Sequence, residues 1–226
     1  IADSYDATRG GEERGAAFAD SLRAWLPSSG RILEVGVGTG AVAATLHRDG
    51  YDIVGVDLSP AMLARAADRL GARVAVADVH RLPLASDSMA GAYATWVLHV
   101  VADPAAVLAE VARVLRTGGV FVAILSTPGE VSTDVDRLLR DLQARLRGER
   151  ADAPERIEAH AVAAGFELIG RAEVPNQPHG LVPNEIVERI HQRTYSVLFD
   201  VDEQTWQTEV EPVPAAGPVG NGTHGQ

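Results

Sequence analysis

The sequence predicts an α/β fold with a doubly wound, mostly parallel sheet and a small helical cap. The first observation is the stretch at residues 31–40, which reads as a strand, a glycine-rich turn and the start of a helix. The second is the alternation of strand-like and helix-like patterns after it, with crossovers of a dozen or more residues, as parallel strands require. The length of 226 residues suits one such domain.

The elements follow from local patterns. An amphipathic helix is expected ahead of the first strand, because apolar residues recur at near-helical spacing there. Asp103 and Pro104 are typical of a helix start, and we expect that helix to run to Arg116 before a turn at residues 117–119. Strands are expected at residues 31–35, 51–57, 73–78, 90–95, 120–125 and 166–174. Helices are expected at residues 12–26, 103–116, 131–147, 154–164 and 183–198, and a further helix is expected to begin at residue 41.

The turn after the first strand has the chemistry of a ligand site. Gly36, Gly38 and Gly40 form the pattern G-x-G-x-G, preceded by Glu34, and glycine lets a ligand approach the backbone at the start of a helix. This spacing differs from the G-x-G-x-x-G pattern of dinucleotide-binding proteins.

Carboxylates end the next two strands. Asp57 is suited to accept hydrogen bonds from a ribose diol, which fits either NAD or an adenosyl ligand. Asp78 is suited to accept from an adenine amino group. The two acids therefore indicate an adenine nucleoside without deciding which one.

These residues resemble the class I, Rossmann-like S-adenosylmethionine-dependent methyltransferases, in particular the small-molecule branch of the type 11/25 kind. The resemblance covers roughly residues 30–126 and consists of five motifs in the family's order and spacing. The motifs are residues 33–40 (LEVGVGTG), 56–63 (VDLSPAML), 77–84 (ADVHRLPL), 96–104 (WVLHVVADP) and 110–119 (EVARVLRTGG).

The resemblance implies a cofactor, a reaction and a layout. S-adenosyl-L-methionine is converted to S-adenosyl-L-homocysteine as a hydroxyl, amine or carbon nucleophile of a small molecule, such as a natural-product metabolite, is methylated. We expect one methyltransferase domain over residues 1–226. Its parts are an N-terminal arm and helix (1–26), a cofactor-binding core (30–126), a C-terminal part with the cap (127–200) and a flexible tail rich in Pro, Gly and Ala (211–226). We find no convincing seventh strand, because residues 208–211 are too few.

The resemblance also names site residues. Those expected to bind the cofactor are Tyr5, Arg9, Glu34, Gly36, Gly38, Gly40, Asp57, Leu58, Met62, Asp78, Val79 and Trp96. At the substrate, Trp96 and His99 are expected from the strand end in the fold that this chain resembles. His179, and His191 and Tyr195 on the expected cap helix, are further substrate candidates outside the residues that carry the resemblance.

His99 is the candidate catalytic residue, since an imidazole with an ordinary pKa near 6.5 can accept a proton near neutrality. The alternative is a structural histidine after the fourth strand. Methyl transfer from a sulfonium places its largest demand on alignment, so we favour a positioning role for His99.

Composition narrows the function. The chain has no cysteine and no lysine, which excludes thiolate chemistry and Schiff-base catalysis, and no metal site is expected. The net charge of -11 argues against a nucleic-acid partner. No apolar stretch suits a membrane span, so we expect a cytoplasmic monomer or homodimer.

Two other functions stay open. One is an enzyme that retains the cofactor without methylating, or a binding protein on the same fold. The other is an NAD-dependent oxidoreductase, which the glycine spacing and the position of Asp78 disfavour.

Overall fold

The chain consists of two compact units in the computed structural model. The first comprises Ile1–Thr127 and Ala151–Asn176, and the second Pro128–Arg150 and Gln177–Gln226. The structure describes Tyr5, Asp6 and residues 11–125, 141–142, 144–146, 152–174, 188, 190–193, 198 and 201–211. Residues 212–226 of the predicted tail and most of the predicted helices at 131–147 and 183–198 lie outside these residues.

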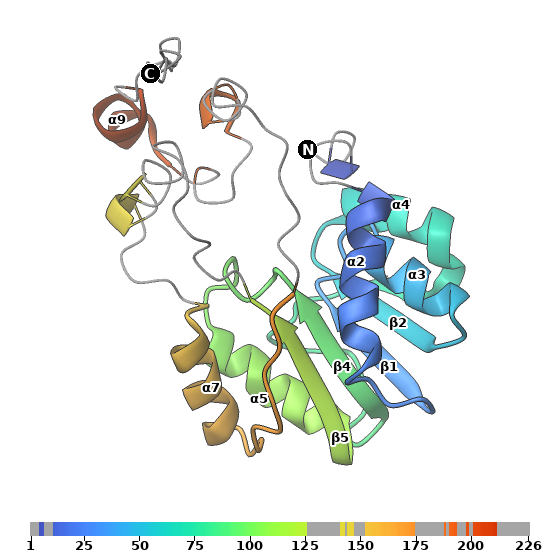
Figure 1. The fold of residues 1–226 in the computed structure, drawn as a ribbon. Helices are drawn as coiled ribbons and strands as arrows, with labels where there is room; N and C mark the ends of the chain where they lie inside the picture. The colour runs from blue at the N-terminus through green and yellow to red at the C-terminus, as the bar shows by residue number, and fades with distance from the viewer. Residues whose placement is uncertain are drawn as a thin grey trace, which may run out of the picture. The chain divides into compact units, whose positions relative to one another are not determined.

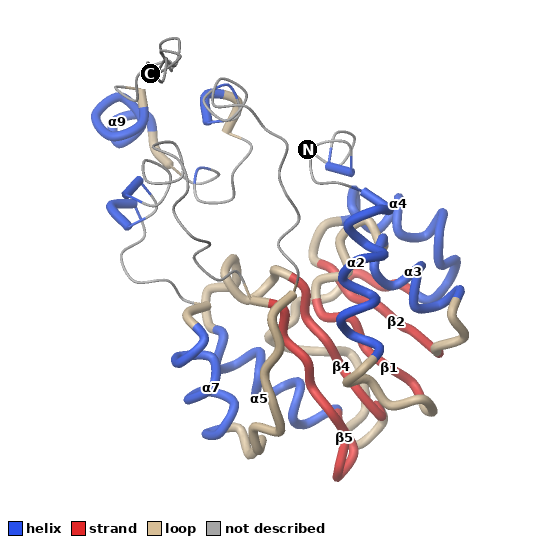
Figure 2. The backbone as a smooth tube through the Cα atoms, in the orientation of Figure 1, coloured by secondary structure: helices blue, strands red, loops and turns tan. Residues whose placement is uncertain are grey.

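The first unit contains a five-stranded parallel sheet with the strand order β3-β2-β1-β4-β5 (Figures 1 and 2). The strands are β1 (Arg31–Val35), β2 (Asp52–Asp57), β3 (Val74–Val76), β4 (Met89–Thr95) and β5 (Leu115–Ile124). The central strand β1 lies between β2 and β4, and residues 32–35 are all buried. The predicted parallel α/β sheet is confirmed.

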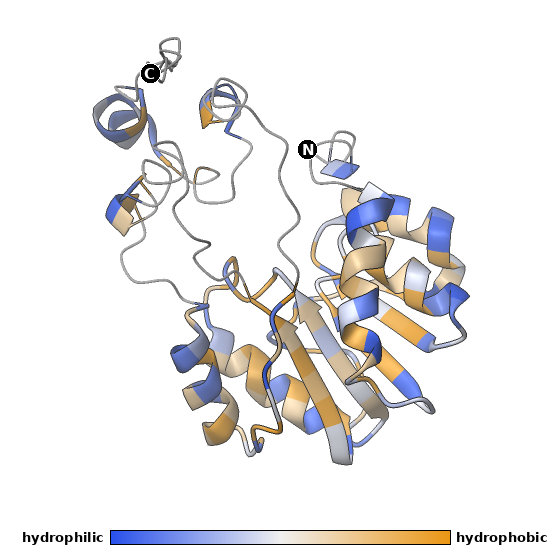
Figure 3. Ribbon diagram, in the orientation of Figure 1, coloured by the Kyte–Doolittle hydropathy of each residue, from blue (hydrophilic) through white to orange (hydrophobic). Residues whose placement is uncertain are grey.

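Helices cover both faces of the sheet, so the doubly wound arrangement is also confirmed. The helices are α2 (Gly11–Arg23), α3 (Ala41–Arg48), α4 (Pro60–Leu70), α5 (Pro104–Val114) and α7 (Pro154–Ala163). Apolar residues of α2, α3 and α4 form one core cluster with the sheet, and those of α5 and α7 form a second. Figure 3 shows hydrophilic residues on the outer sides of these helices.

The start of α5 is as the sequence predicts, because the Asp103 side chain accepts a hydrogen bond from the Ala106 amide at 3.1 Å. Its end is earlier than predicted. Leu115 is extended and buried and already pairs with Met89, so β5 begins there. The predicted turn at residues 117–119 is instead an irregularity within β5, where Gly118 has φ 75°.

The predicted sixth strand at residues 166–174 is wrong, since this segment forms no strand. A strand requires a ladder of backbone hydrogen bonds, whereas this segment is held by side chains. Phe166 packs on Phe121 with ring centroids 5.9 Å apart, and Arg171 pairs with Glu158 at 2.5 Å. Figure 1 shows the segment running beside β5.

The second unit has a small apolar core of its own, formed by Leu142, Ile190, Leu198, Trp206 and Val210. Its elements with defined bounds are α9 (Glu203–Thr205) and the π-helical turn η3 (Trp206–Val210). Residues 208–210 therefore form part of a helical turn. Its described residues 141–142, 144–146, 188 and 190–191 are also helical. In the described part of the chain, no helix has the length and apolarity that crossing a membrane requires.

Candidate active site

The glycine turn connects the carboxyl end of β1 to α3. Gly36 and Gly38 have φ values of 73° and 54°, which side-chain-bearing residues rarely adopt. A Cβ on Gly36 would lie 2.6 Å from Val97, whereas a Cβ on Gly38 would meet nothing within 4 Å. Gly36 thus permits close packing, and Gly38 leaves its backbone open to a ligand.

Asp57 fixes this turn from the end of β2. One carboxylate oxygen accepts from the Gly38 amide at 2.8 Å, and the other accepts from the Ser59 amide at 2.8 Å. Each oxygen keeps a further lone pair, so the carboxylate can also accept hydrogen bonds from hydroxyls of a ligand. Leu58 beside it is 69% exposed and offers apolar surface to a planar base.

Asp78 follows β3 and is held by a turn with His80. Its carboxylate accepts from the His80 amide at 2.9 Å and contacts the His80 ring nitrogen Nδ1 at 2.7 Å. These two hydrogen bonds lower the pKa of the exposed Asp78 carboxyl. Val79 is buried in the second core cluster, so it anchors the turn from below.

Glu34 is a buried acid, only 1% exposed, on the central strand. The hydroxyls of Tyr93 and Thr95 donate to its two carboxyl oxygens at 2.9 and 3.2 Å. Burial raises the pKa of Glu34 to about 8, although these hydrogen bonds and one from the Ala43 backbone act in the opposite direction. Glu34 is therefore largely protonated at neutral pH.

A cavity lies between the glycine turn, the end of β4 and the N-terminal part of α2. Its described lining residues are Tyr5, Asp6, Gly11, Arg14, Gly15, Phe18, Glu34, Gly36, Val37, Gly38, Thr39, Ala41, Val42, Thr95 and Trp96. All of them belong to the first unit. The cavity is thus built at the carboxyl ends of β1 and β4, where open α/β sheets bind ligands.

The N-terminal segment is tied to the glycine turn through Asp6. Its carboxylate accepts from the Thr39 hydroxyl at 2.6 Å and from the Arg69 guanidinium at 2.7 Å. Arg69 also donates to the Thr39 carbonyl at 2.7 Å. Burial acts to raise the pKa of Asp6, but the hydrogen bonds from Thr39 and Arg69 outweigh it, so the pKa is lowered. The network holds Tyr5 at the cavity wall.

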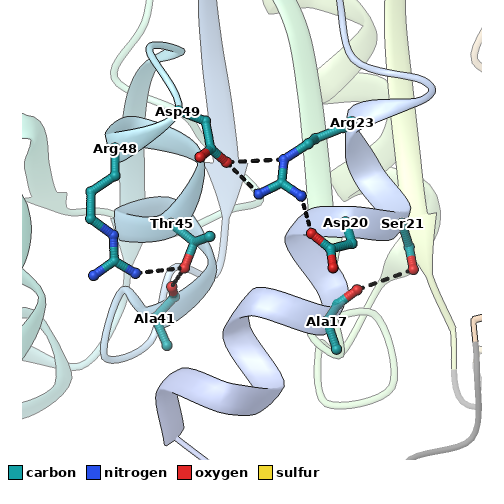
Figure 4. Close-up of polar contacts among 8 residues, drawn as sticks. All are labelled: Ala17, Asp20, Ser21, Arg23, Ala41, Thr45, Arg48 and Asp49. Carbon is teal, nitrogen blue, oxygen red and sulfur yellow. Dashed lines mark hydrogen bonds and ion pairs between the residues drawn. The ribbon is translucent and has the colours of Figure 1, made fainter.

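Helix α2 is held against α3 at two points. A Cβ on Gly15 would lie 2.9 Å from the Ala41 carbonyl, so the helices touch there through backbone. At the other end, Arg23 bridges Asp20 and Asp49 and contacts Asp49 at 2.5 Å (Figure 4). This packing brings two side chains of α2, Arg14 and Phe18, into the cavity wall.

Among the predicted substrate residues that the structure describes, only Trp96 lines the cavity, and its ring packs edge-on against Phe18 with centroids 4.9 Å apart. His99 is half-buried in the turn after β4 and is not among the described lining residues. His191 belongs to the second unit, where it packs against Trp206. Arg9, His179 and Tyr195 lie outside the described residues.

Sequence reasoning missed several residues that line the cavity or support its walls through hydrogen bonds. Tyr93 and Thr95 carry a signal, because they are polar at alternate positions of an otherwise apolar strand, and Tyr93 pairs with Glu34 in the sheet. Asp6, Arg14 and Arg69 carry none, because their roles depend on how α2 and α4 pack.

The comparisons with known proteins agree with this geometry. Residues 33–123 match the family model described as a methyltransferase domain. An uncharacterized methyltransferase of Mycobacterium tuberculosis is 34% identical over 89% of this chain and 81% of its own. The ubiquinone/menaquinone biosynthesis C-methyltransferase UbiE of Desulfotalea psychrophila is 35% identical over 57% of this chain and 56% of its own, so the match spans just over half of that relative.

A solved structure is also similar. The S-adenosylmethionine-dependent methyltransferase of Mesorhizobium loti is 30% identical, with a TM-score of 0.54 over 68% of this chain and 82% of that one. The sheet order, the glycine turn and these relatives agree. The chain belongs to the class I, Rossmann-like family of S-adenosylmethionine-dependent methyltransferases.

Proposed function

We propose that this enzyme transfers the methyl group of S-adenosylmethionine to a hydroxyl, amine or carbon nucleophile of a small molecule bound near the end of β4. The observation that carries the proposal is the cavity between the glycine turn, Glu34 and Trp96, with Asp57 fixed beside it. Its walls offer backbone amides, a carboxylate and an aromatic face, which suit the parts of this cofactor.

The residues fit an adenosyl ligand in order along the sheet edge. Asp57, which is fixed by the Gly38 amide, would accept hydrogen bonds from the ribose hydroxyls, and the exposed Leu58 would pack on the adenine. The open backbone at Gly38 would accommodate the methionyl part, and Glu34 at the cavity wall would receive its ammonium group. When bound, S-adenosylmethionine supplies a methyl group on a cationic sulfur.

The protein then has to align the nucleophile and exclude water, since the leaving group is already activated. Any proton that the nucleophile carries leaves to a base or to water. His99, in the turn after β4, positions this part of the site in our proposal.

The substrate class follows from charge and from the relatives. A net charge of -11 disfavours nucleic acids. The name of the Desulfotalea psychrophila relative supports a carbon nucleophile of a quinone-like ring as the first acceptor to test. Phenolic hydroxyls and amines of specialised metabolites are the next classes.

The test is transfer of a labelled methyl group from S-adenosylmethionine to a panel of hydroquinones, phenols and amines. We expect one class to be labelled by the wild type. Asp57→Ala should reduce labelling at limiting cofactor, because a charged hydrogen bond of about 1 to 3 kcal/mol is lost. The matched control is Asp52→Ala at the opposite end of β2, which should label normally.

A protein that binds S-adenosylmethionine tightly and labels no acceptor would contradict the proposal and favour a cofactor-retaining, non-methylating enzyme. Binding of NAD in preference to S-adenosylmethionine would instead favour the oxidoreductase.

A further inference from the structure

Trp96 has an unusual backbone conformation at the wall of the cavity. Its φ of 56° lies in the left-handed region, which a bulky residue rarely adopts. The residue follows β4 directly, and its amide still donates to the Ile124 carbonyl at 3.3 Å. Such strain persists only where the surroundings enforce it, and it concentrates at functional sites.

The surroundings of Trp96 show what its conformation achieves. The edge-on contact with Phe18, with an interplanar angle of 76°, fixes the orientation of the indole. Phe18 is itself held by α2, whose contact with α3 at Gly15 leaves no room for a side chain. One face of the indole is therefore presented at a fixed position to the cavity.

That face carries a cation. The guanidinium carbon of Arg14 lies over the Trp96 ring, 2.9 Å from its centroid, and 5.3 Å from the centroid of Phe18. An aromatic face attracts cations through the negative potential of its π-system, most strongly for tryptophan. The other ionisable side chains of the described lining, apart from Tyr5, are the acids Asp6 and Glu34, which do not compete for the face.

The position of this face along the sheet indicates which ligand group reaches it. Asp57 ends β2, the glycine turn follows β1, and Trp96 follows β4, and these strands are neighbours in that order. A ligand with its ribose at Asp57 and its amino acid part over the glycine turn has the group that joins these two parts beside the turn, and Trp96 lines the same cavity as Gly36 and Gly38. In S-adenosylmethionine the joining group is the sulfonium, a cation.

Arg14 also limits the space. The cavity has a volume of about 80 Å³, below the roughly 300 Å³ at which ligand pockets begin. Removing the guanidinium from the indole both enlarges the cavity and exposes the face that a cation can take.

We propose that the indole face of Trp96 is the cation-binding surface of the cofactor site, covered by Arg14 in this structure and by the sulfonium of S-adenosylmethionine in the complex. This inference rests on the proposed function. It gives Trp96 a role in distinguishing the cationic cofactor from its neutral product. Once the sulfur is a thioether, the face no longer attracts it, and the return of Arg14 favours product release.

The test measures dissociation constants for S-adenosylmethionine and S-adenosylhomocysteine by calorimetry in the wild type, Trp96→Phe, Trp96→Leu and Arg14→Met. In Trp96→Leu, we expect the preference for the cationic ligand over the neutral one to fall by about 5-fold to 30-fold. Trp96→Phe should give an intermediate loss. Arg14→Met should tighten the cationic ligand more than the neutral one, and this gain should vanish in the double variant with Trp96→Leu.

The control is Trp25→Leu, a tryptophan that packs near Gly170 away from the cavity lining, and circular dichroism verifies that each variant is folded. An unchanged ratio of the two affinities in folded Trp96→Leu or Trp96→Phe would overturn the inference while leaving the proposed function intact. If Arg14→Met weakened the binding of both ligands equally, Arg14 would bind a group that both ligands share. That result would overturn the claim that the sulfonium displaces Arg14 from the indole face. Failure of the wild type to bind either ligand would overturn the proposed function as well.

Discussion

Glu34 shows how one residue can serve both the core and the site. It lies on the central strand with its carboxyl buried, yet it faces the cavity and is held by two hydroxyls from β4. Burial favours the protonated, uncharged form of Glu34, whereas an ammonium group bound nearby would favour its ionised form. The sequence predicted that Glu34 belongs to the glycine motif. It could not predict the burial of Glu34 or its hydroxyl partners, because these partners come from β4 and depend on how the strands pair.

We predict that Glu34→Gln changes how stability depends on pH. The folded protein keeps the Glu34 proton up to a pKa of about 8, whereas the unfolded chain loses it at the ordinary carboxyl pKa. The unfolded state binds fewer protons between these values, so the wild type should lose up to about 1.4 kcal/mol of unfolding free energy per pH unit as the pH rises. The glutamine variant should lack this slope.

Urea denaturation from pH 5 to 8.5 measures the slope for wild type and variant. Glu167→Gln, at an exposed position, serves as the control and should follow the wild type. Parallel curves for wild type and Glu34→Gln would show that Glu34 is ionised in the folded protein.

His99 is the candidate catalytic residue of the sequence, but the structure does not place it in the described wall of the cavity. We expect His99→Gln to keep nearly full turnover from pH 6 to 9, because His99 is not among the described residues that line the cavity. The measurement is the pH–rate profile with an identified acceptor. A drop of roughly 100-fold, with loss of the limb near pH 6.5, would make His99 a general base instead.

At the scale of elements, the sequence correctly predicted those helices, strands and turns that local residue patterns determine. The glycine turn, the capped start of α5 and the strands up to β4 follow from periodicity and capping residues. The segment at residues 166–174 could not be judged in this way, because a β-like pattern forms a strand only where a neighbouring strand pairs with it. The end of α5 was misjudged because Gly118 accommodates a bulge as well as a helix stop.

Helix α2 determines the cavity wall through its contact with α3. Gly15→Ala should weaken cofactor binding and lower the melting temperature, although alanine favours helix by about 1 kcal/mol over glycine. The new Cβ would lie 2.9 Å from the Ala41 carbonyl, so α2 must move and carry Arg14 and Phe18 with it. Thermal unfolding and calorimetry measure the two effects.

The control for this variant is Glu12→Ala, an exposed position on the same helix that also introduces alanine. Glu12→Ala should bind the cofactor normally. If Gly15→Ala bound the cofactor as well as the wild type and were more stable, the close contact would not set the position of α2.

At the scale of the molecule, the order of the motifs along the chain predicted the sheet. A strand, a glycine turn and acids after the next two strands place the ligand groups at one edge once the strands are parallel, and the observed strands are parallel. The strand order β3-β2-β1-β4-β5 was not predicted. Sequence reasoning did not find the polar network of Asp6 and Arg69, because it joins residues 63 positions apart through tertiary packing. The second unit forms its own core, and its part in substrate binding stays a prediction.

The central claim is that S-adenosylmethionine binds along the carboxyl ends of β2, β1 and β4, and its most direct test is a crystal structure with S-adenosylhomocysteine. The account predicts ribose hydroxyls within hydrogen-bond distance of Asp57, the homocysteine part against Gly36 and Gly38, and the sulfur beside Trp96. A ligand bound elsewhere on the chain, or one whose ribose lies away from Asp57, would contradict it.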